Sequence, residues 1–151
     1  MMQMYSRLNE KVDAWAPLIA RVFIAGIFLW AGYGKLEKFS DFAAQLGTVL
    51  PLLPGTAWAA LAVIFEFGGA LLLLIGYKTR EAAWMLIVFT LIATVIAHTS
   101  ILAPAGTLFQ IDWSNALKNL AVIGGLLLVG RVGSSCLSLD MKMKERMGGI
   151  M

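Results

Sequence analysis

The stretch that decides the fold is residues 57–77, AWAALAVIFEFGGALLLLIGY. A helix needs about 20 mostly apolar residues to cross a bilayer, and Glu66 is the one acidic or basic side chain in this stretch. An ionised carboxylate at mid-membrane costs roughly 2.5–3.5 kcal/mol, whereas each large aliphatic or phenylalanine residue contributes about −0.3 to −0.6 kcal/mol. The apolar residues offset the cost of Glu66, so the stretch is predicted to span the membrane, with Glu66 needing a partner or a proton.

Three more apolar stretches of similar length accompany this one. They cover residues 16–34, 82–98 and 114–130. None shows the regular alternation of apolar and polar residues that is typical of membrane β-barrels. The sequence therefore predicts an all-α membrane protein, a four-helix transmembrane bundle.

The connection after the first span also has a helical pattern. Phe39, Phe42 and Leu46 recur at helical spacing, and Gly47 closes the stretch. We expect a short interfacial helix between transmembrane helices 1 and 2. Two glycine pairs, Gly68-Gly69 and Gly124-Gly125, are expected to let helices pack closely within the bilayer.

The composition excludes several classes of protein. The chain has 151 residues, of which 60% are hydrophobic and 14% charged, whereas a soluble domain usually carries about 25% charged residues. The length suits one domain, and the net charge of +3 is too small to indicate a nucleic-acid partner. Disorder and ordinary soluble enzymes are equally poor fits, so the lipid bilayer is the predicted environment.

One cysteine and one histidine limit the redox chemistry of the chain. Cys136 cannot form an intrachain disulfide. His98 alone cannot supply a bis-histidine haem or a zinc site with three or four protein ligands. We therefore expect no intrinsic haem or metal, and any redox centre would be a bound small molecule or a partner's cofactor.

Lys and Arg are distributed unevenly between the two sides of the predicted bundle. Both termini and the turn at 77–80 hold most of them, whereas the opposite side holds Lys35, Lys38 and Lys118. The positive-inside rule then places both termini of this multi-pass protein in the cytoplasm. The predicted parts are a cytoplasmic N-terminal segment at 1–15, the four-helix domain at 16–133 and a cytoplasmic tail at 134–151. The tail is polar and glycine-ended and is expected to fray.

Ionisable residues inside a membrane are candidates for function. Each predicted helix contributes at least one polar group, and the set is Arg21, Lys35, Glu66, His98, Lys118 and Asn119. We expect these groups to converge on one pocket for a small head group that carries carbonyl or anionic oxygens, such as a quinone. Glu66 and His98 would be the catalytic proton exchangers, and the other four would bind the ligand.

Each of these residues also has a structural interpretation. Glu66 and Arg21 could form an ion pair that fixes the helix register, Lys35 could extend to the interface, and His98 could cap its helix. Asp112 and Ser114 are better explained as N-caps of the fourth helix than as catalytic groups.

Several motifs together resemble those of the DoxX family of small bacterial membrane proteins. The match runs from Arg21 to Asp140. Its motifs are Arg21 with Ala31-Gly32-Tyr33-Gly34-Lys35, Glu66-Phe67-Gly68-Gly69 with Gly76-Tyr77-Lys78-Thr79-Arg80, His98-Thr99-Ser100, Lys118-Asn119-Leu120 with Gly124-Gly125, and Ser138-Leu139-Asp140. The resemblance implies a four-helix bacterial inner-membrane protein, and some relatives are linked to thiosulfate:quinone oxidoreductase or to other membrane oxidoreductase complexes.

Three functions follow from these observations and stay open at the level of sequence. The first is a quinone-interacting subunit of a membrane oxidoreductase that needs a redox protein partner. The second is a non-catalytic anchor or assembly subunit for such a partner. The third is a small proton-linked transporter or lipid-handling protein, for which four short spans would favour a homo-oligomer.

Overall fold

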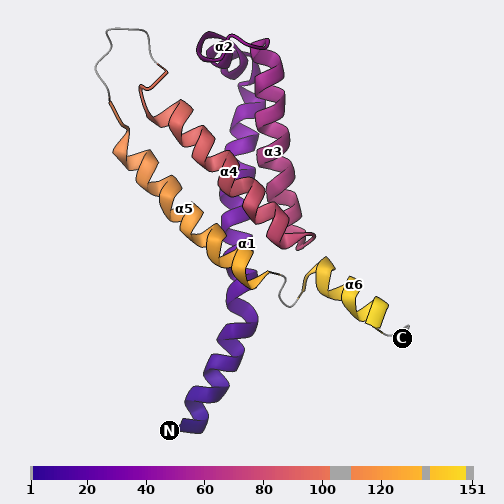
Figure 1. Cartoon of the computed structure of the whole chain (residues 1–151). Coiled ribbons are helices and arrows are strands. Elements are labelled where there is room, and N and C mark those ends of the chain that lie inside the picture. The colour runs from indigo at the N-terminus through magenta and orange to yellow at the C-terminus, as the bar shows by residue number, and fades with distance from the viewer. Residues whose placement is uncertain (1, 103–109, 134–136, 149–151) are drawn as a thin grey trace.

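The computed structural model describes residues 2–102, 110–133 and 137–148, so Cys136 lies outside the described residues. This part of the chain contains six helices, whose arrangement can be followed in Figure 1. They are α1 (Met2–Glu37), α2 (Phe39–Val49), α3 (Gly55–Ile75), α4 (Thr79–His98), α5 (Trp113–Val132) and α6 (Leu139–Gly148). The all-α fold and the short helix between the first two spans are confirmed.

Four of these helices are long and apolar enough to cross a membrane. The spanning segments are Trp15–Glu37 within α1, Gly55–Ile75, Thr79–His98 and Trp113–Val132. They agree with the predicted spans to within a few residues at each end. Hydropathy predicts these spans correctly because nearly every side chain of a membrane-spanning helix must be apolar.

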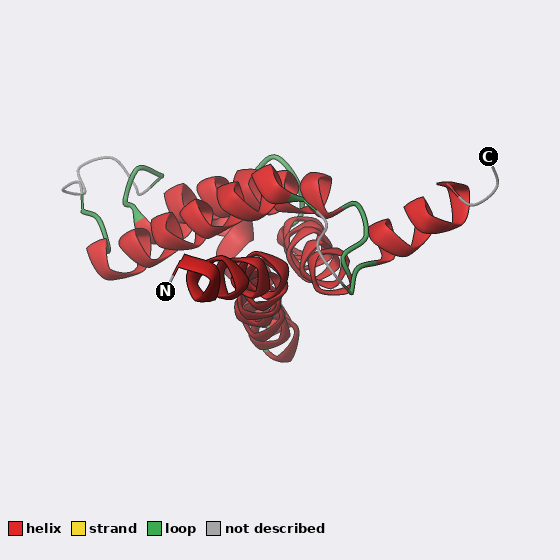
Figure 2. Cartoon of the chain, turned by 90° about the horizontal axis from the view of Figure 1, so that it is seen from below, coloured by secondary structure: helices red, strands yellow, loops and turns green. Residues whose placement is uncertain are grey.

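Helix α3 occupies the centre of the packing arrangement, because it contacts α1, α2 and α4. Helix α4 packs against α5, which also contacts α1 (Figures 1 and 2). A Cβ atom on Gly69 would lie 2.8 Å from Met85 Cε, and one on Gly125 would lie 3.0 Å from Ile24 Cδ1. One glycine of each predicted pair therefore allows close helix packing, whereas Gly68 and Gly124 have open space beside them.

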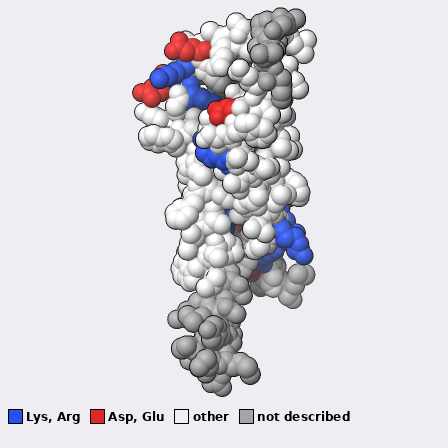
Figure 3. All heavy atoms as spheres, turned by 90° about the vertical axis from the view of Figure 1, so that its left-hand side faces the viewer, with Lys and Arg blue, Asp and Glu red and all other residues white. Residues whose placement is uncertain are grey.

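The outer surface of the bundle is as apolar as its core. Leu73, Leu86 and Leu126 are fully buried, while Phe23 is 70% exposed and Trp30 is 79% exposed. Figure 3 shows one face on which uncharged groups predominate, with charged groups gathered in its upper half and at its lower right. Large apolar patches of this kind are costly in water and favourable in lipid.

Helix α2 lies directly on the start of α3. A Cβ atom on Gly55 would clash with the carbonyl oxygen of Ala43, so only glycine allows this approach. Ala43, Leu46 and Ala59 form a small core between the two helices. The Trp58 indole N–H donates a hydrogen bond of 3.0 Å to the carbonyl of Leu50, which fixes the connection between them.

The C-terminal segment is helical over Leu139–Gly148 and its start is tied to the bundle, so the prediction of a frayed tail was wrong for these residues. The Asp140 carboxylate accepts hydrogen bonds from the backbone N–H of Lys78 at 2.8 Å and from the backbone N–H and hydroxyl of Thr79, both at 3.0 Å. The backbone N–H of Asp140 donates to the carbonyl of Gly76 at 3.0 Å. Asp140 thus caps the first turn of α4 from a distant part of the sequence.

Arg21 completes this arrangement, which we call the C-terminal clasp (Arg21, Gly76, Thr79, Ser138 and Asp140). Arg21 is fully buried and donates from Nη2 to the carbonyl of Leu137 at 3.3 Å. Gly76 has a φ of +69°, and a Cβ atom there would lie 2.5 Å from Ser138 Cβ and 2.9 Å from Arg21 Nη1. The left-handed backbone and the close approach both require glycine at this position.

Removing the Asp140 carboxylate should destabilise the bundle. Asp140→Ala leaves the first N–H groups of α4 without their cap, and such losses cost about 0.5–2 kcal/mol. Thermal unfolding in mild detergent would measure the effect. Glu145→Ala, a substitution at an exposed acid on the same helix, is the matched control and should leave the midpoint unchanged. Equal midpoints for both variants would contradict the capping role.

The same carboxylate should make stability depend on pH. Desolvation raises the pKa of Asp140, but the hydrogen bonds from Thr79 and Lys78 outweigh it and hold the pKa below its ordinary value. A lowered pKa in the folded state adds stability that is fully present above about pH 4, the ordinary range of Asp, and is lost as the pH falls through the folded pKa. The difference in unfolding midpoint between the wild type and Asp140→Asn should therefore shrink on acidification.

Candidate functional site

The partner of the mid-membrane carboxylate is Lys35. Its Nζ lies 2.7 Å from Oε2 of Glu66, within hydrogen-bond and ion-pair distance. Glu66 is 3% exposed, in the middle of α3, and Lys35 lies in the last turn of α1. A Cβ atom on Gly32 would lie 3.0 Å from the Phe67 ring, so α1 and α3 approach closely beside the pair.

The alternative pairing of Glu66 with Arg21 was wrong. The guanidinium of Arg21 lies against Gly76 in the C-terminal clasp. Gly76 is ten residues beyond Glu66, which corresponds to about 15 Å along a helix. The side chains of Arg21 and Lys35 are both long enough to reach from α1 to a neighbouring helix. Their positions along α1 determine that Lys35, and not Arg21, reaches the Glu66 carboxylate.

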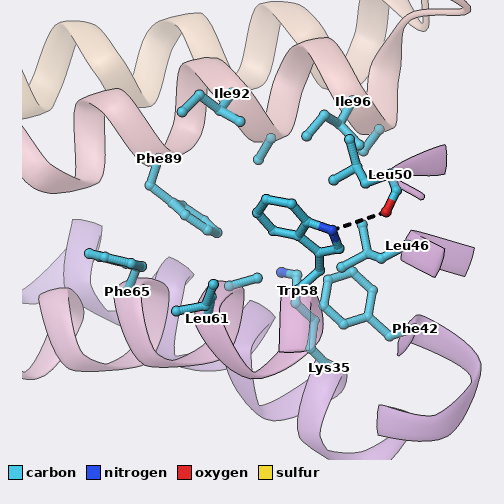
Figure 4. Close-up of a pocket in the computed structure, with 13 residues that line it drawn as sticks. Lys35, Phe42, Leu46, Leu50, Trp58, Leu61, Phe65, Phe89, Ile92 and Ile96 are labelled. Atoms are coloured by element: carbon cyan, nitrogen blue, oxygen red, sulfur yellow. Dashed lines mark hydrogen bonds between the residues drawn. The ribbon is translucent and has the colours of Figure 1, made fainter. Parts of the chain in front are cut away.

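A cavity of about 260 Å³ lies between α2, α3 and α4, next to the ion pair. Its walls are almost entirely aliphatic and aromatic (Figure 4). The lining residues are Lys35, Phe42, Leu46, Leu50, Trp58, Leu61, Ala62, Phe65, Phe89, Ile92, Ala93, Ile96 and Ala97. We call this space the α2–α4 cavity.

Lys35 is the charged residue of this lining. Its Nζ lies 5.9 Å from the centroid of the Phe42 ring, within the range of a cation–π contact. The side chain is 27% exposed, compared with 4% for Glu66. The α2–α4 cavity is therefore an apolar chamber with one ammonium group in its wall and a buried carboxylate behind that group.

A second hollow of about 410 Å³ adjoins the α2–α4 cavity along α3 and α4. The two spaces share Phe65, Phe89 and Ile92. The second hollow is also lined by Trp84 and Val88, nearer the start of α4. Two adjacent apolar hollows thus lie between Lys35 and the start of α4.

His98 and Asp112 lie together at another place, where α4 ends and α5 begins. His98 Nδ1 is 3.6 Å from Asp112 Oδ2, and the Asp112 N–H donates to the His98 carbonyl at 2.9 Å. Asp112 also accepts from the N–H of Asn115 at 3.2 Å, so its predicted role as an N-cap is confirmed. Hydrogen bonds from the Asn115 side chain and backbone hold the pKa of Asp112 below its ordinary value.

Lys118 and Asn119 face different neighbours. Lys118 is exposed and donates to the side-chain carbonyl of Asn115 at 2.5 Å. Asn119 donates to the hydroxyl of Thr94 at 2.9 Å, linking α5 to α4. These contacts stabilise the α4–α5 pair locally.

The expectation that all six polar residues share one pocket was therefore wrong. The structure brings Lys35 and Glu66 together and places Arg21 in the C-terminal clasp. His98, Lys118 and Asn119 make contacts within the α4–α5 pair. Among the described residues, no cluster of three or more His, Cys, Asp and Glu side chains could hold a metal ion.

The aromatic lining of the α2–α4 cavity is the part of the site that the sequence analysis missed. A signal for it exists in the spacing. Residues 58, 61, 62 and 65 of α3 follow the i, i+3, i+4, i+7 pattern of one helix face, and residues 89, 92, 93 and 96 of α4 repeat it. In a membrane helix the faces that meet protein and lipid are equally apolar, so this pattern alone does not identify a cavity.

Lys35 and Glu66 should behave as a coupled pair in stability measurements. Lys35→Met leaves a buried carboxylate without its cation, which should cost about 1–3 kcal/mol. This is less than the roughly 3–5 kcal/mol typical of fully buried pairs, because Lys35 is partly exposed. The double variant Lys35→Met/Glu66→Gln should recover most of the loss. A double-mutant cycle of unfolding free energies would measure the coupling, and strictly additive effects would contradict it.

Comparison with known proteins places the site in a family context. The sequence profile of the DoxX family matches residues 16–99, a range that contains Lys35, Glu66 and the whole cavity lining. The Inner membrane protein YphA of Escherichia coli (strain K12) is 32% identical, over 82% of this chain and 86% of the relative. The Inner membrane protein YqjF of the same organism is 27% identical, over 91% of this chain and 98% of the relative. No solved structure matches the chain. With this profile match and its four long apolar helices, the chain belongs to the DoxX family of integral membrane proteins.

Proposed function

We propose that the protein is a quinone-interacting subunit of a membrane oxidoreductase in the bacterial inner membrane, and that the α2–α4 cavity receives the quinone ring. The observation that carries the proposal is the pairing of an apolar, aromatic-lined chamber with the single ammonium of Lys35. The two relatives named as inner membrane proteins support the location.

The chemistry of the chamber suits a quinone ring. Phe42, Trp58 and Phe89 offer flat surfaces on which a ring can stack. A lysine ammonium has three donors and no acceptor, and one of the donors of Lys35 is used by Glu66. The remaining donors can reach a carbonyl oxygen of the ring, which is the polar group that a quinone presents.

The volumes of the two hollows match the two parts of a quinone, the ring and the isoprenoid tail. A volume of about 260 Å³ is just below the roughly 300–1,000 Å³ of typical ligand pockets, so it would hold a ring and little more. The hollow of about 410 Å³ that follows along α3 and α4 would hold the first part of the isoprenoid tail. The rest of the tail would lie in the surrounding lipid.

The ion pair gives the site a route for protons. Reduction of a quinone to a quinol takes two electrons and two protons. In each of two rounds, Lys35 would give one proton to a ring oxygen and become a neutral amine. Glu66, which is ionised while it pairs with Lys35, would take up a proton from water and pass it to that amine, so that two protons reach the ring and the ion pair is restored. With one histidine and one cysteine in the chain, the proposal assigns the electrons to the cofactor of a redox protein partner.

The charge distribution supports one orientation of the site. The excess of Lys and Arg at the termini and at the α3–α4 turn favours a cytoplasmic position for both termini under the positive-inside rule. Helix α2, Lys35 and the α2–α4 cavity would then lie in the half of the membrane that faces away from the cytoplasm.

Filling the cavity should remove the quinone. The protein would be purified in mild detergent and extracted with organic solvent, and quinone would be quantified by chromatography and absorbance. Ala93→Trp places an indole in the cavity and should abolish co-purification. Ala121→Trp makes the same change at an exposed position of α5 and should leave the quinone content unchanged.

The double variant Lys35→Met/Glu66→Gln tests the role of the Lys35 ammonium in quinone binding. It removes both charges and keeps the apolar walls of the cavity. Loss of a hydrogen bond from a charged group should weaken quinone binding about 10- to 100-fold. A wild-type protein that carries phospholipid and no quinone would contradict the proposal and favour a lipid-handling role.

A further inference from the structure

Helix α6 leaves the bundle at the end where the C-terminal clasp lies. Figure 1 shows it beyond the ends of α3 and α5, and Figure 2, the view from below, shows it extending sideways from the bundle. Asp140 ties its first turn to Gly76, Lys78 and Thr79. These contacts hold the start of α6 at the level where α3 ends and α4 begins.

One stripe of α6 is apolar and faces away from protein. Leu139, Met143 and Met147 follow each other at intervals of four residues, so they lie above one another on one helix face. Their exposed fractions are 41%, 47% and 59%. No described residue of α6 is buried, so this stripe has no cover within the described chain.

Basic side chains flank that stripe on both sides. At 100° per residue, Lys142 and Arg146 lie on one side of it and Lys144 on the other. Glu145 lies on the opposite face together with Met141, and Asp140 is already engaged in the clasp. Three exposed bases at the same end of the bundle, Lys78, Arg80 and Arg131, extend the positive surface.

We propose that α6 is a membrane-surface helix that binds anionic phospholipid headgroups. The stripe of Leu139, Met143 and Met147 enters the boundary between headgroups and acyl chains, and Lys142, Lys144 and Arg146 contact lipid phosphates. An apolar stripe with basic flanks is the pattern of helices that lie in the interface. Charge complementarity selects an anionic lipid surface as the occupant, because basic segments beside a span are attracted to it.

The clasp gives this surface helix a fixed starting point. A free amphipathic segment must first find the bilayer, whereas α6 is held beside it by the hydrogen bonds of Asp140. Each Lys or Arg near an anionic surface is then expected to favour the bound state about fivefold.

The test uses the full chain in lipid nanodiscs, with Cys136→Ser as the background. An environment-sensitive fluorophore is attached to a single cysteine introduced as Met143→Cys, in the apolar stripe, or as Glu145→Cys, on the opposite face. Nanodiscs of phosphatidylcholine are compared with nanodiscs that also contain phosphatidylglycerol. Lipids with a quencher on the acyl chain report whether each probe enters the bilayer.

The proposal expects the probe at 143 to be blue-shifted and quenched, more strongly with phosphatidylglycerol, while the probe at 145 reports water. Replacing Lys142, Lys144 and Arg146 with glutamine should remove the dependence on phosphatidylglycerol, and high salt should do the same. Equal spectra at 143 and 145 in both lipids would overturn the proposal, as would binding of α6 to a protein partner without lipid contact.

Discussion

A carboxylate in the middle of a lipid-spanning helix needs a proton or a compensating charge from another helix, because the bilayer core cannot stabilise it. Here Lys35 meets Glu66 at 2.7 Å, and that contact fixes the end of α1 against the middle of α3. Helix α2 begins at Phe39, only four residues after Lys35. The ion pair therefore also determines where α2 can lie, and with it the position of the α2–α4 cavity.

The two ends of the bundle are closed by acidic caps of different origin. Asp112 caps α5 from the adjacent position in the sequence and lies 3.6 Å from His98 of α4. Asp140 caps α4 from the far end of the chain and is assisted by the buried Arg21. Both carboxylates accept hydrogen bonds from the free N–H groups at the start of a membrane helix, where unpaired donors are costly. Among the described residues, much of the polar chemistry is concentrated where helices begin and end. The Lys35–Glu66 pair and the Asn119–Thr94 hydrogen bond instead lie within the spans.

Sequence reasoning performed well wherever a single helix determines the outcome. The four spans follow from hydropathy, and α2 follows from the spacing of Phe39, Phe42 and Leu46. It performed poorly where two helices must be placed relative to each other. Arg21 and Lys35 are both long cations on α1, and only the depth of each against α3 reveals that Lys35 reaches Glu66. The folded tail could not be predicted, because the cap at Asp140 acts on Thr79 across 61 positions of sequence and has no local signature.

The position of Asp140 has a consequence for biogenesis. Synthesis proceeds from the N-terminus, so the cap of α4 emerges only after all four spans have left the ribosome. Until then the first N–H groups of α4 lack their acceptor, and Arg21 lacks the carbonyl of Leu137. A nascent chain cut short before this point would keep every membrane segment yet leave one end of the bundle open. Residues 137–140 thus couple the stability of the membrane domain to a segment that is synthesised after all four spans.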